Sequence, residues 1–559
     1  MISEQRFSKF RSRGETIGKI VLFFTVLLAF FLRVWRMNDL PHGFNADEAA
    51  IGYNVYSLLQ TGEDEYGNSW PLHFRSFADY KPGGYFYLAL PFVRFLGLTE
   101  LAVRLPSLIA GVLSVYLIFL LAGELTPDQK RRSFGLMAAF LLAISPWHIQ
   151  FSRAAWETNV ATCFLICGAW LFLKGTRKHR FGFLIGSLLS LVASTYIYHS
   201  ARIMAPWLLL VLIWLNKKAF FSFGKKNLLF LVIGGLVSLP LLLSLVRGGA
   251  MARFSGVGIM GDLGPFWSTN RLRGEHGSQI NSWWVRLLHN RPLAYGVKVV
   301  QNWASHFSGD FLFVEGDRIR RSQCPGLGQF YYGDLFLVIA GLFFTAKTGS
   351  RNLTFPLLWL LAAPLPAALT LQSPHALRSH SMIIPLLLVA AEGVCRMFNF
   401  LKKKKLFFIL GLGMIVLAYS WQLGFFLNQY LVHYPYREPQ VWEGGFRELI
   451  EYLGPIYQRY QRIYVTDHYD QPYILFLFYL KYPPEMFQQE AELTPRDKFH
   501  FSTVRDFANF HFEAINWENL KKKKDILIVG TDEEIPDTAK IIKRIYFKNG
   551  RPAFEIAEL

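Results

Sequence analysis

The first polar segment of the chain holds two groups of charged residues whose types could support group transfer. Asp47 and Glu48 are adjacent, and Asp79 precedes Lys81 in a stretch with a rigid proline and two permissive glycines. A carboxylate can orient or deprotonate an incoming hydroxyl or amine, and a cation can stabilise charge on a departing group. In the alternative interpretation, Asp47 only caps a helix, where a carboxylate is also favoured.

Further basic residues recur near the predicted ends of apolar runs. Arg153 stands four residues before Glu157, a spacing that would allow a structural ion pair on a helix. Any one of these side chains could instead anchor a span at the membrane surface. Taken together, they can hold a lipid phosphate whose tail remains in the hydrocarbon. The predicted catalytic residues are Asp47, Glu48 and Asp79, and the predicted donor-phosphate-binding residues are Lys81, Arg153, His199, Arg202, His375 and Arg378.

The reaction predicted from these residues is transfer of a sugar from a polyprenyl-phosphate donor. The phosphate is a good leaving group, so one carboxylate acting by direct displacement would invert the anomeric centre. The sequence has no Gly-rich phosphate loop and no dinucleotide fingerprint. Its four cysteines predict neither a disulfide framework nor a zinc site. No metal ligands are predicted and no cofactor is required, although a divalent metal is compatible with the chemistry.

The elements that must position these residues are membrane spans. The chain has 559 residues, of which 52% are hydrophobic and 18% charged, whereas about 25% charged residues are usual in soluble proteins. Nearly uncharged runs of about 20 residues match the length needed to cross a bilayer. They predict an α-helical polytopic membrane protein with about 11 transmembrane helices, at residues 17–35, 101–123, 134–150, 157–173, 181–199, 203–215, 227–246, 331–347, 353–371, 380–396 and 406–424.

The distribution of basic residues predicts the orientation of these spans. Every turn assigned to the cytoplasm carries Lys or Arg, as the positive-inside rule requires. The net charge of +19 is therefore attributed to topology, and nucleic-acid binding is not expected. We predict a multi-pass protein of the cell membrane with a cytoplasmic N-terminus. The loops 36–100 and 247–330 then lie outside, and so do the predicted active site and the C-terminal tail.

The tail loses the apolar runs and gains the pattern of a small α/β domain. Residues 462–466 and 525–529 have the pattern of buried strands, and helices are predicted near 442–452 and 471–480. We therefore predict two domains. Residues 1–429 form the transmembrane domain, and residues 430–559 form an extracytoplasmic α/β domain.

Several stretches resemble one family of membrane enzymes. They include Asp47-Glu48 followed by Gly52-Tyr53, the run from Asp79 to Pro82, the run from Tyr198 to Arg202, and the loop from Pro374 to Arg378. The stretches Ala102–Ser107, Ser145–His148, Phe151–Arg153 and Gln471–Tyr473 are similar too. The chain resembles GT-C glycosyltransferases of the protein O-mannosyltransferase and ArnT-like superfamily, the phospholipid carrier-dependent glycosyltransferases.

This resemblance implies an extracytoplasmic active site with an acidic residue of the first loop at its centre. Asp47 matches the family's acidic position, and Lys81 matches a lysine associated with the carrier phosphate. ArnT-type members have Glu directly before that lysine, whereas this chain has Tyr80 there and Asp79 one residue earlier. The expected partners are a polyprenyl-phosphate sugar, membrane lipid and a protein, lipid or glycan acceptor.

Three other functions fit parts of the same pattern. A flippase or transporter for a lipid-linked sugar would carry charges or broken helices at mid-membrane and often internal repeats. A glycan ligase with a diphosphate carrier would share the architecture and differ in its donor. An external sensor or scaffold would not need the acidic and basic clusters.

Overall fold

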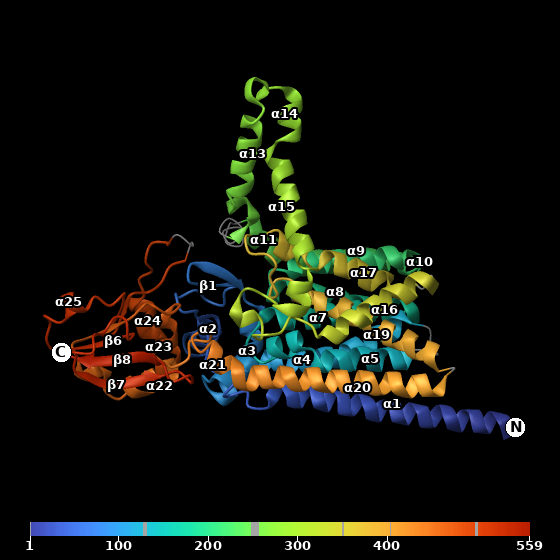
Figure 1. The fold of residues 1–559 in the computed structure, drawn as a ribbon, viewed down its shortest axis with the longest axis horizontal. Coiled ribbons are helices and arrows are strands. Elements are labelled where there is room, and N and C mark those ends of the chain that lie inside the picture. Colours follow the sequence, from blue (N-terminus) through green and yellow to red (C-terminus); the bar gives the residue numbers. More distant parts are fainter. Residues whose placement is uncertain (1, 127–130, 247–256, 349–350, 403, 498–500) are drawn as a thin grey trace. The chain divides into compact units, whose positions relative to one another are not determined.

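A computed structural model describes residues 2–126, 131–246, 257–348, 351–402, 404–497 and 501–559 (Figure 1). The chain divides into two compact units. Unit 1 comprises Met1–Arg33, Ile109–Ser152 and Glu157–Phe426, and unit 2 comprises Val34–Leu108, Arg153–Trp156 and Leu427–Leu559. The tail therefore does not stand alone as a unit, because it folds with the first polar segment.

Unit 1 is a bundle of apolar helices, as expected of segments that must satisfy their backbone hydrogen bonds within lipid. Its main helices are α1 (Ile2–Val34), α4 (Glu100–Leu125), α5 (Arg131–Ile144), α6 (Pro146–Ser152), α7 (Glu157–Lys178), α8 (Phe181–Ile197), α9 (Ala201–Leu215), α10 (Lys217–Phe221), α11 (Lys226–Val246), α16 (Tyr332–Thr348), α17 (Thr354–Ala362), α18 (Leu365–Ala368), α19 (Ile383–Leu401) and α20 (Lys405–Asn428).

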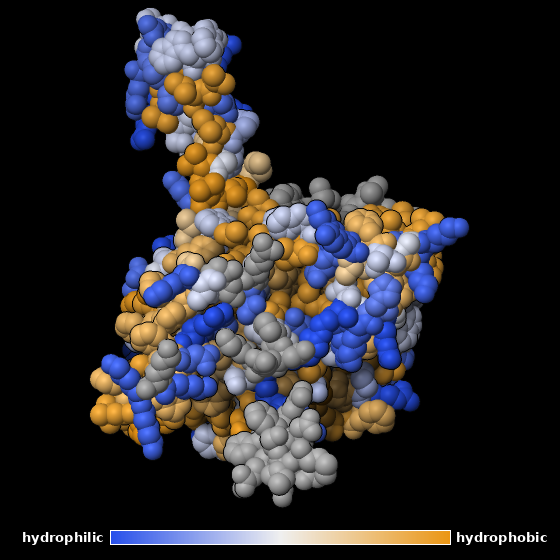
Figure 2. Space-filling model, turned by 90° about the vertical axis from the view of Figure 1, so that its right-hand side faces the viewer, coloured by the Kyte–Doolittle hydropathy of each residue, from blue (hydrophilic) through white to orange (hydrophobic). Residues whose placement is uncertain are grey.

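Each of the predicted spans coincides with a helix or with a pair of short helices. Among the described residues, six helices are long and apolar enough to cross a membrane, and the bent pair α5–α6 would make a seventh. Other apolar helices, such as α8 and α9, are shorter, with 10–17 residues. Figure 2 faces the end of the bundle where α1 begins, and hydrophilic residues gather there beside hydrophobic ones. The chain is a multi-pass membrane protein.

Small residues allow the closest helix contacts in this bundle. A Cβ atom on Gly341 of α16 would lie 2.1 Å from the carbonyl oxygen of Val389 in α19, and one on Gly393 would lie 2.1 Å from that of Leu337. Helices in lipid associate through such close backbone approaches rather than through a hydrophobic driving force. Glycine at these two positions therefore fixes how α16 and α19 pack.

Three further helices of unit 1 form a hairpin that projects from the bundle: α13 (Gly264–Gly274), α14 (Trp283–Leu288) and α15 (Arg291–Ser305). The hairpin runs across the direction of α20 in Figure 1. Its base is bonded to the end of α18, because Asn302 donates from Nδ2 to the carbonyl oxygen of Ala368 at 3.2 Å.

The first polar segment gives unit 2 two helices and a small hairpin. They are α2 (Ala46–Thr61), β1 (His73–Ser76), β2 (Asp79–Pro82) and α3 (Gly84–Leu96). β1 and β2 pair antiparallel, with Phe74 opposite Lys81. Phe77 and Ala78 between the strands both have positive φ, 56° and 63°, as the tight turn of such a hairpin requires.

The tail adds a mixed six-stranded sheet with the order β4-β5-β3-β6-β8-β7. Its elements are α21 (Tyr434–Arg437), α22 (Phe446–Leu453), β3 (Arg462–Val465), α23 (Pro472–Leu480), α24 (Pro484–Glu490), β4 (Asp506–Phe507), β5 (Phe510–Phe512), α25 (Trp517–Leu520), β6 (Ile526–Gly530), β7 (Ile541–Tyr546) and β8 (Pro552–Glu558). Both predicted strands and both predicted helices are present. β3 is parallel to β5 and β6, while the other pairs are antiparallel.

The tail and the first polar segment share one core. Gly52 of α2 lies against the Phe478 ring of α23, so closely that an added Cβ would be 2.5 Å from the ring. Tyr53 of α2 donates its hydroxyl to the carbonyl oxygen of Tyr482 at 3.1 Å. These contacts fix the helix that carries Asp47 against the tail.

Candidate active site

Asp47 lies in the first turn of α2 and faces Lys81. The Asn45 side chain caps this helix by accepting from the Glu48 backbone N–H at 3.1 Å. The interpretation of Asp47 as the cap is therefore wrong. Lys81 places its Nζ 2.5 Å from Oδ1 of Asp47. The Asp47 side chain is 44% exposed whereas that of Lys81 is buried, so the carboxylate is the solvent-facing member of the pair.

The β1–β2 hairpin positions the Lys81 ammonium. Lys81 follows a turn of two strained residues, and its Nζ lies 5.4 Å from the centre of the Phe77 ring, a favourable cation–π distance. Asp79 lies two residues before Lys81 and so shares its strand face. The Tyr80 backbone N–H donates to Oδ1 of Asp79 at 2.8 Å. The hairpin thus presents an acid and a cation from one strand.

Glu48 has an environment unlike that of its neighbour Asp47. Arg104 of α4 donates to both of its carboxylate oxygens at 2.9 Å, and the Ala155 backbone N–H donates to Oε1 at 2.8 Å. Both charged side chains are fully buried. Glu48 therefore joins three separate chain segments of unit 2, which assigns it a positioning role beside Asp47.

Arg104 extends this network. Its Nη1 lies 3.5 Å from Oε2 of Glu100, and Oε1 of Glu100 accepts from Arg447 of α22 and from the Tyr479 hydroxyl at the end of α23. Arg104 lies in the stretch Ala102–Ser107 that resembles the family, but no role was predicted for it. The available signal was an arginine near the start of a long apolar run, where an unpaired charge would be costly.

Glu65 is a further buried acid in the first segment that sequence analysis missed. Asn54 donates from Nδ2 to Oε1 of Glu65 at 3.0 Å, and the Glu65 backbone N–H donates to Oδ1 of Asn54 at 3.0 Å. Burial raises the pKa of Glu65 to about 8, against the opposing effects of the Asn54 hydrogen bond and the charges of Lys81 and Arg75. Glu65 is therefore largely protonated at neutral pH.

Arg153 lies in unit 2 as a buried anchor. Its Nη2 donates to the backbone carbonyl oxygens of Trp35 at 2.8 Å and Leu40 at 3.1 Å. The predicted helical spacing between Arg153 and Glu157 is wrong, because α6 ends at Ser152 and α7 begins at Glu157. These bonds hold the chain that enters α2.

The remaining predicted cations lie in unit 1. His375 and Arg378 occupy the loop after α18, and Arg378 donates from Nη1 to Oγ1 of Thr370 at 2.6 Å. His199 and Arg202 lie where α8 gives way to α9, and the Arg202 backbone N–H donates to the His199 carbonyl oxygen at 3.0 Å. Two groups of predicted site residues thus exist, one within each unit.

The His375 loop is bonded to two residues of the segment 247–330, neither of which was selected from the sequence. Nδ1 of His375 lies 3.5 Å from Oδ2 of Asp317, and its backbone N–H donates to Nε2 of His306 at 3.1 Å. Nδ1 of His306 in turn donates to the Asn302 carbonyl oxygen at 2.8 Å. Burial lowers the pKa of His306 to about 4, so this imidazole is neutral at physiological pH.

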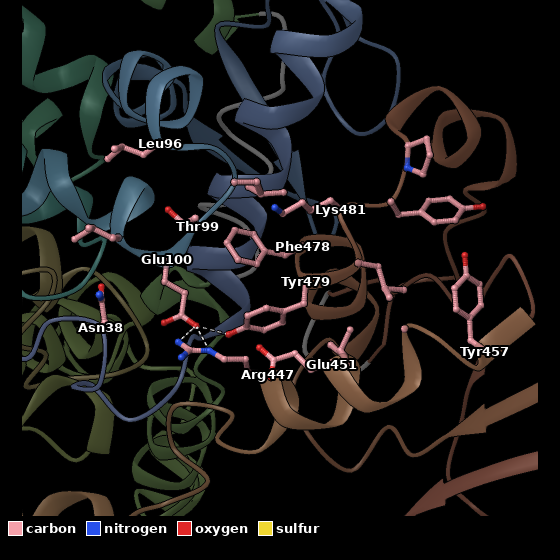
Figure 3. A pocket seen from close by; sticks show the side chains of 17 residues that line it. Asn38, Leu96, Thr99, Glu100, Arg447, Glu451, Tyr457, Phe478, Tyr479 and Lys481 are labelled. Atoms are coloured by element: carbon pink, nitrogen blue, oxygen red, sulfur yellow. Dashed lines mark hydrogen bonds and ion pairs between the residues drawn. The ribbon is translucent and has the colours of Figure 1, made fainter.

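A cavity of about 840 Å³ lies within unit 2 (Figure 3). The corner between α3 and α4 lines one side, and α22 and the end of α23 line the other. Glu100, Arg447 and Tyr479 form its hydrogen-bonded floor. Within the described residues, no group of three or more His, Cys, Asp or Glu side chains could hold a metal ion.

Comparison with known proteins shows which proteins this chain resembles. Residues 80–244 match the family model of dolichyl-phosphate-mannose-protein mannosyltransferases, and no curated protein matches the chain. The structure of ArnT from Cupriavidus metallidurans in the apo state is similar, with a TM-score of 0.52 at 13% identity over 97% of this chain and 98% of that one. The same protein bound to undecaprenyl phosphate gives 0.50 at 12% identity, with 98% of both chains covered.

An archaeal oligosaccharyltransferase, AglB from Archaeoglobus fulgidus in complex with an inhibitory peptide and a dolichol-phosphate, is also similar. Its TM-score is 0.52 at 13% identity, and the match covers 84% of this chain but only 64% of that one. The chain therefore has the GT-C fold that its sequence resemblance implied, and it shares this fold with ArnT and AglB.

Proposed function

We propose that the protein moves a single sugar from a polyprenyl-phosphate donor to an acceptor on the extracytoplasmic face of the cell membrane. The observation that carries this proposal is the pairing of a half-exposed Asp47 with a buried Lys81 at 2.5 Å, at the N-terminus of α2. A helix N-terminus favours bound anions, and Lys81 adds a positive charge to it. The undecaprenyl phosphate and dolichol-phosphate held by the two similar structures support a lipid phosphate as the carrier.

In the proposed reaction, Asp47 accepts the proton of the acceptor hydroxyl or amine. The acceptor atom forms a bond to the anomeric carbon, and the bond from that carbon to the phosphate oxygen breaks with inversion. Lys81 stabilises the negative charge that grows on the departing phosphate, the largest effect available in such a site. Asp79, on the same strand face as Lys81, is proposed to orient the acceptor.

The other predicted cations are proposed to assist the carrier. His199, Arg202, His375 and Arg378 would contact the phosphate or its lipid, while Arg153 acts on the site through the backbone that it anchors. No cofactor is needed in this scheme, and a divalent metal bound to the phosphate would assist Lys81 without replacing it.

A second candidate is transfer of an oligosaccharide from a diphosphate carrier. The fold similarity to AglB, an oligosaccharyltransferase, favours it. The acceptor is then a protein, as the peptide bound to AglB suggests, whereas the first candidate also accommodates a lipid or a glycan. A lipid-linked sugar flippase would move the donor without breaking the bond between sugar and phosphate.

A donor-consumption assay separates these functions. Purified protein in nanodiscs receives labelled polyprenyl-monophosphate or polyprenyl-diphosphate sugars, together with a membrane extract as the acceptor source. The proposal expects label to leave the monophosphate donor, and expects Asp47→Asn to stop this transfer. Asp39→Asn is the matched control, because Asp39 lies nearby in an exposed ion pair with Arg36 at 3.3 Å. Transfer from the diphosphate donor alone would favour the second candidate, and intact donor in every reaction would contradict both.

A further inference from the structure

The 840 Å³ cavity of unit 2 has the size and lining of a ligand site. Pockets for small ligands typically enclose about 300–1,000 Å³ and combine apolar walls with a few polar groups. Here Leu96, Leu98 and Ile450 supply apolar wall, and Figure 3 shows the polar groups from α22 and α23. None of these residues was selected by sequence analysis.

Two charged side chains of the cavity wall, those of Lys481 and Glu451, are available to a ligand. Lys481 is exposed and has a left-handed backbone at φ 50°, and its ammonium makes no hydrogen bond or ion pair with the described residues. The same is true of the Glu451 carboxylate. Lys481 is the C-cap residue of α23, and it lines the cavity together with Glu451.

The balance of charge indicates what kind of ligand fits. Arg447 and Lys481 are matched by Glu100 and Glu451 among the lining residues, so a polyanion would meet two carboxylates. Tyr457 and Tyr479 are half-buried and offer ring faces with a polar edge. Carboxylate, guanidinium and ammonium groups beside aromatic rings suit a neutral molecule rich in hydroxyl groups.

We propose that this cavity binds a neutral saccharide, and that it is the acceptor-side subsite of the transferase. The second part rests on the proposed function. A hydrogen-bonded and ionic chain joins the cavity to the candidate centre, from Glu100 through Arg104 to Glu48, the neighbour of Asp47. A saccharide held against Glu100 is thus held by the same network that fixes the start of α2.

The test measures binding separately from transfer. Purified protein in detergent is examined by saturation-transfer NMR and calorimetry with maltotriose, mannotriose and chitotriose as neutral probes, and with inorganic phosphate as the anionic probe. We expect saturable binding of at least one neutral probe, weakened about tenfold by Glu451→Gln or Lys481→Ala, since a hydrogen bond to a charged group is lost. Lys522→Ala, an exposed lysine of the same unit, is the matched control.

The outcomes separate this proposal from the proposed function. Binding should persist in Asp47→Asn, so a failure of the catalytic assignment leaves the saccharide site intact. No saturable binding of any neutral trisaccharide, or binding unaffected by both cavity variants, would overturn the site. Binding of phosphate in preference to every saccharide would overturn its assignment to a neutral ligand.

The hairpin of α13, α14 and α15 carries a second and independent inference. Trp267 is 62% exposed, Trp283 76% and Leu287 62%, although the hairpin lies outside the helices long enough to span a membrane. Residues 264–305 contain five basic residues, Arg271, Arg273, Arg286, Arg291 and Lys298, and one acidic residue, Glu275. Exposed tryptophan and leucine beside basic residues are typical of helices that lie in a membrane interface.

The direction of the hairpin agrees with this composition. It runs across the direction of α20 in Figure 1, and α20 is long and apolar enough to span the membrane. A segment that runs across the direction of a span lies along the bilayer. We infer that the hairpin lies on the membrane and binds anionic lipid headgroups through its basic residues.

A depth measurement on the full chain tests this inference. Leu287→Cys carries an environment-sensitive fluorophore in a chain whose four native cysteines are replaced by serine, and Glu275→Cys is the polar control position. In nanodiscs that contain phosphatidylglycerol, we expect doxyl-lipid to quench the label at 287 more than aqueous iodide does. Arg286→Gln with Lys298→Gln should reduce the difference between phosphatidylglycerol and phosphatidylcholine nanodiscs.

Two results would overturn the membrane assignment. One is equal access of iodide to positions 287 and 275 in both lipids. The other is shielding of position 287 that requires a second copy of the chain, seen as a dependence on the number of copies in each nanodisc.

Discussion

Asp47 and Glu48 are neighbours in the sequence, yet their side chains differ in exposure and in the cation that each one meets. Asp47 faces one lysine and is 44% exposed, while Glu48 is buried against the guanidinium of Arg104. Successive residues of an α-helix point about 100° apart. Because Asn45 fixes where α2 begins, the Glu48 carboxylate points into the core and the Asp47 carboxylate points toward solvent and Lys81.

The cations differ as well as the acids. Arg104 offers a planar fork that bonds both oxygens of Glu48, a geometry suited to permanent buried pairs. Lys81 offers a compact charge to one oxygen of Asp47, which a competing phosphate can share. The buried Glu48–Arg104 pair therefore holds the fold, while the half-exposed Asp47–Lys81 pair is the one that we propose to react.

The largest expected effect is a loss of activity without a loss of stability when Asp47 is replaced. Asp47→Asn should reduce sugar transfer about 10²–10⁴-fold, the usual contribution of a general base. Its melting temperature should stay close to that of wild type, because the side chain is half-exposed and Asn keeps its shape. Transfer rate and thermal unfolding of the same preparation check both halves, and near-normal transfer would remove Asp47 from the mechanism.

Glu48→Gln, unlike Asp47→Asn, should lower the stability of the folded protein. Removing one charge of a buried pair leaves Arg104 uncompensated and typically costs about 3–5 kcal/mol. We expect a clearly lowered melting temperature and a matching loss of folded protein. A variant that is as stable as wild type and inactive would show that Glu48 takes part in the chemistry, which would erase the contrast between the two acids.

The sequence predicted the spans because long apolar runs leave the backbone only one way to satisfy its hydrogen bonds in lipid. It also predicted the tail strands at 462–466 and 525–529, because short runs rich in β-branched and aromatic residues favour strands. Of the acidic and basic residues that it singled out in the first loop, the structure brings Asp47 and Lys81 together.

The sequence could not assign separate environments to Asp47 and Glu48. That difference depends on the phase of α2 against α23, which is set by the contact of Gly52 with Phe478, far away in the chain. Asp317 and His306 were missed for the same reason, because their link to His375 exists only after the loops fold together. Long-range contacts of this kind have no local pattern.

A smaller effect is expected from Lys81→Met, which keeps the buried stem and removes the charge. Loss of a charged contact to the donor phosphate should raise the KM for the polyprenyl-phosphate sugar about tenfold or more. The kcat should also fall if Lys81 stabilises the leaving group in the transition state. Steady-state kinetics with varied donor provide the measurement, and Lys522→Met is the control. Unchanged kinetics would show that the phosphate binds elsewhere.

The smallest expected effect is a pH dependence of stability caused by Glu65. This acid is buried beside Asn54, an environment unlike that of Asp47 or Glu48. Its pKa is raised to about 8 from an ordinary value of 4.5, so folding binds a proton between these values. Stability is then fully present below about pH 4.5 and is lost as pH rises toward 8, by at most about 1.4 kcal/mol per pH unit.

Glu65→Gln imitates the protonated acid and preserves the bond from Asn54. We expect its melting temperature to depend less on pH than that of wild type between pH 5 and 8, with the two proteins most alike at the acidic end. Thermal unfolding at several pH values gives the comparison. Parallel curves would mean that Glu65 is ionised in the folded protein, and that the charges of Lys81 and Arg75 outweigh its burial.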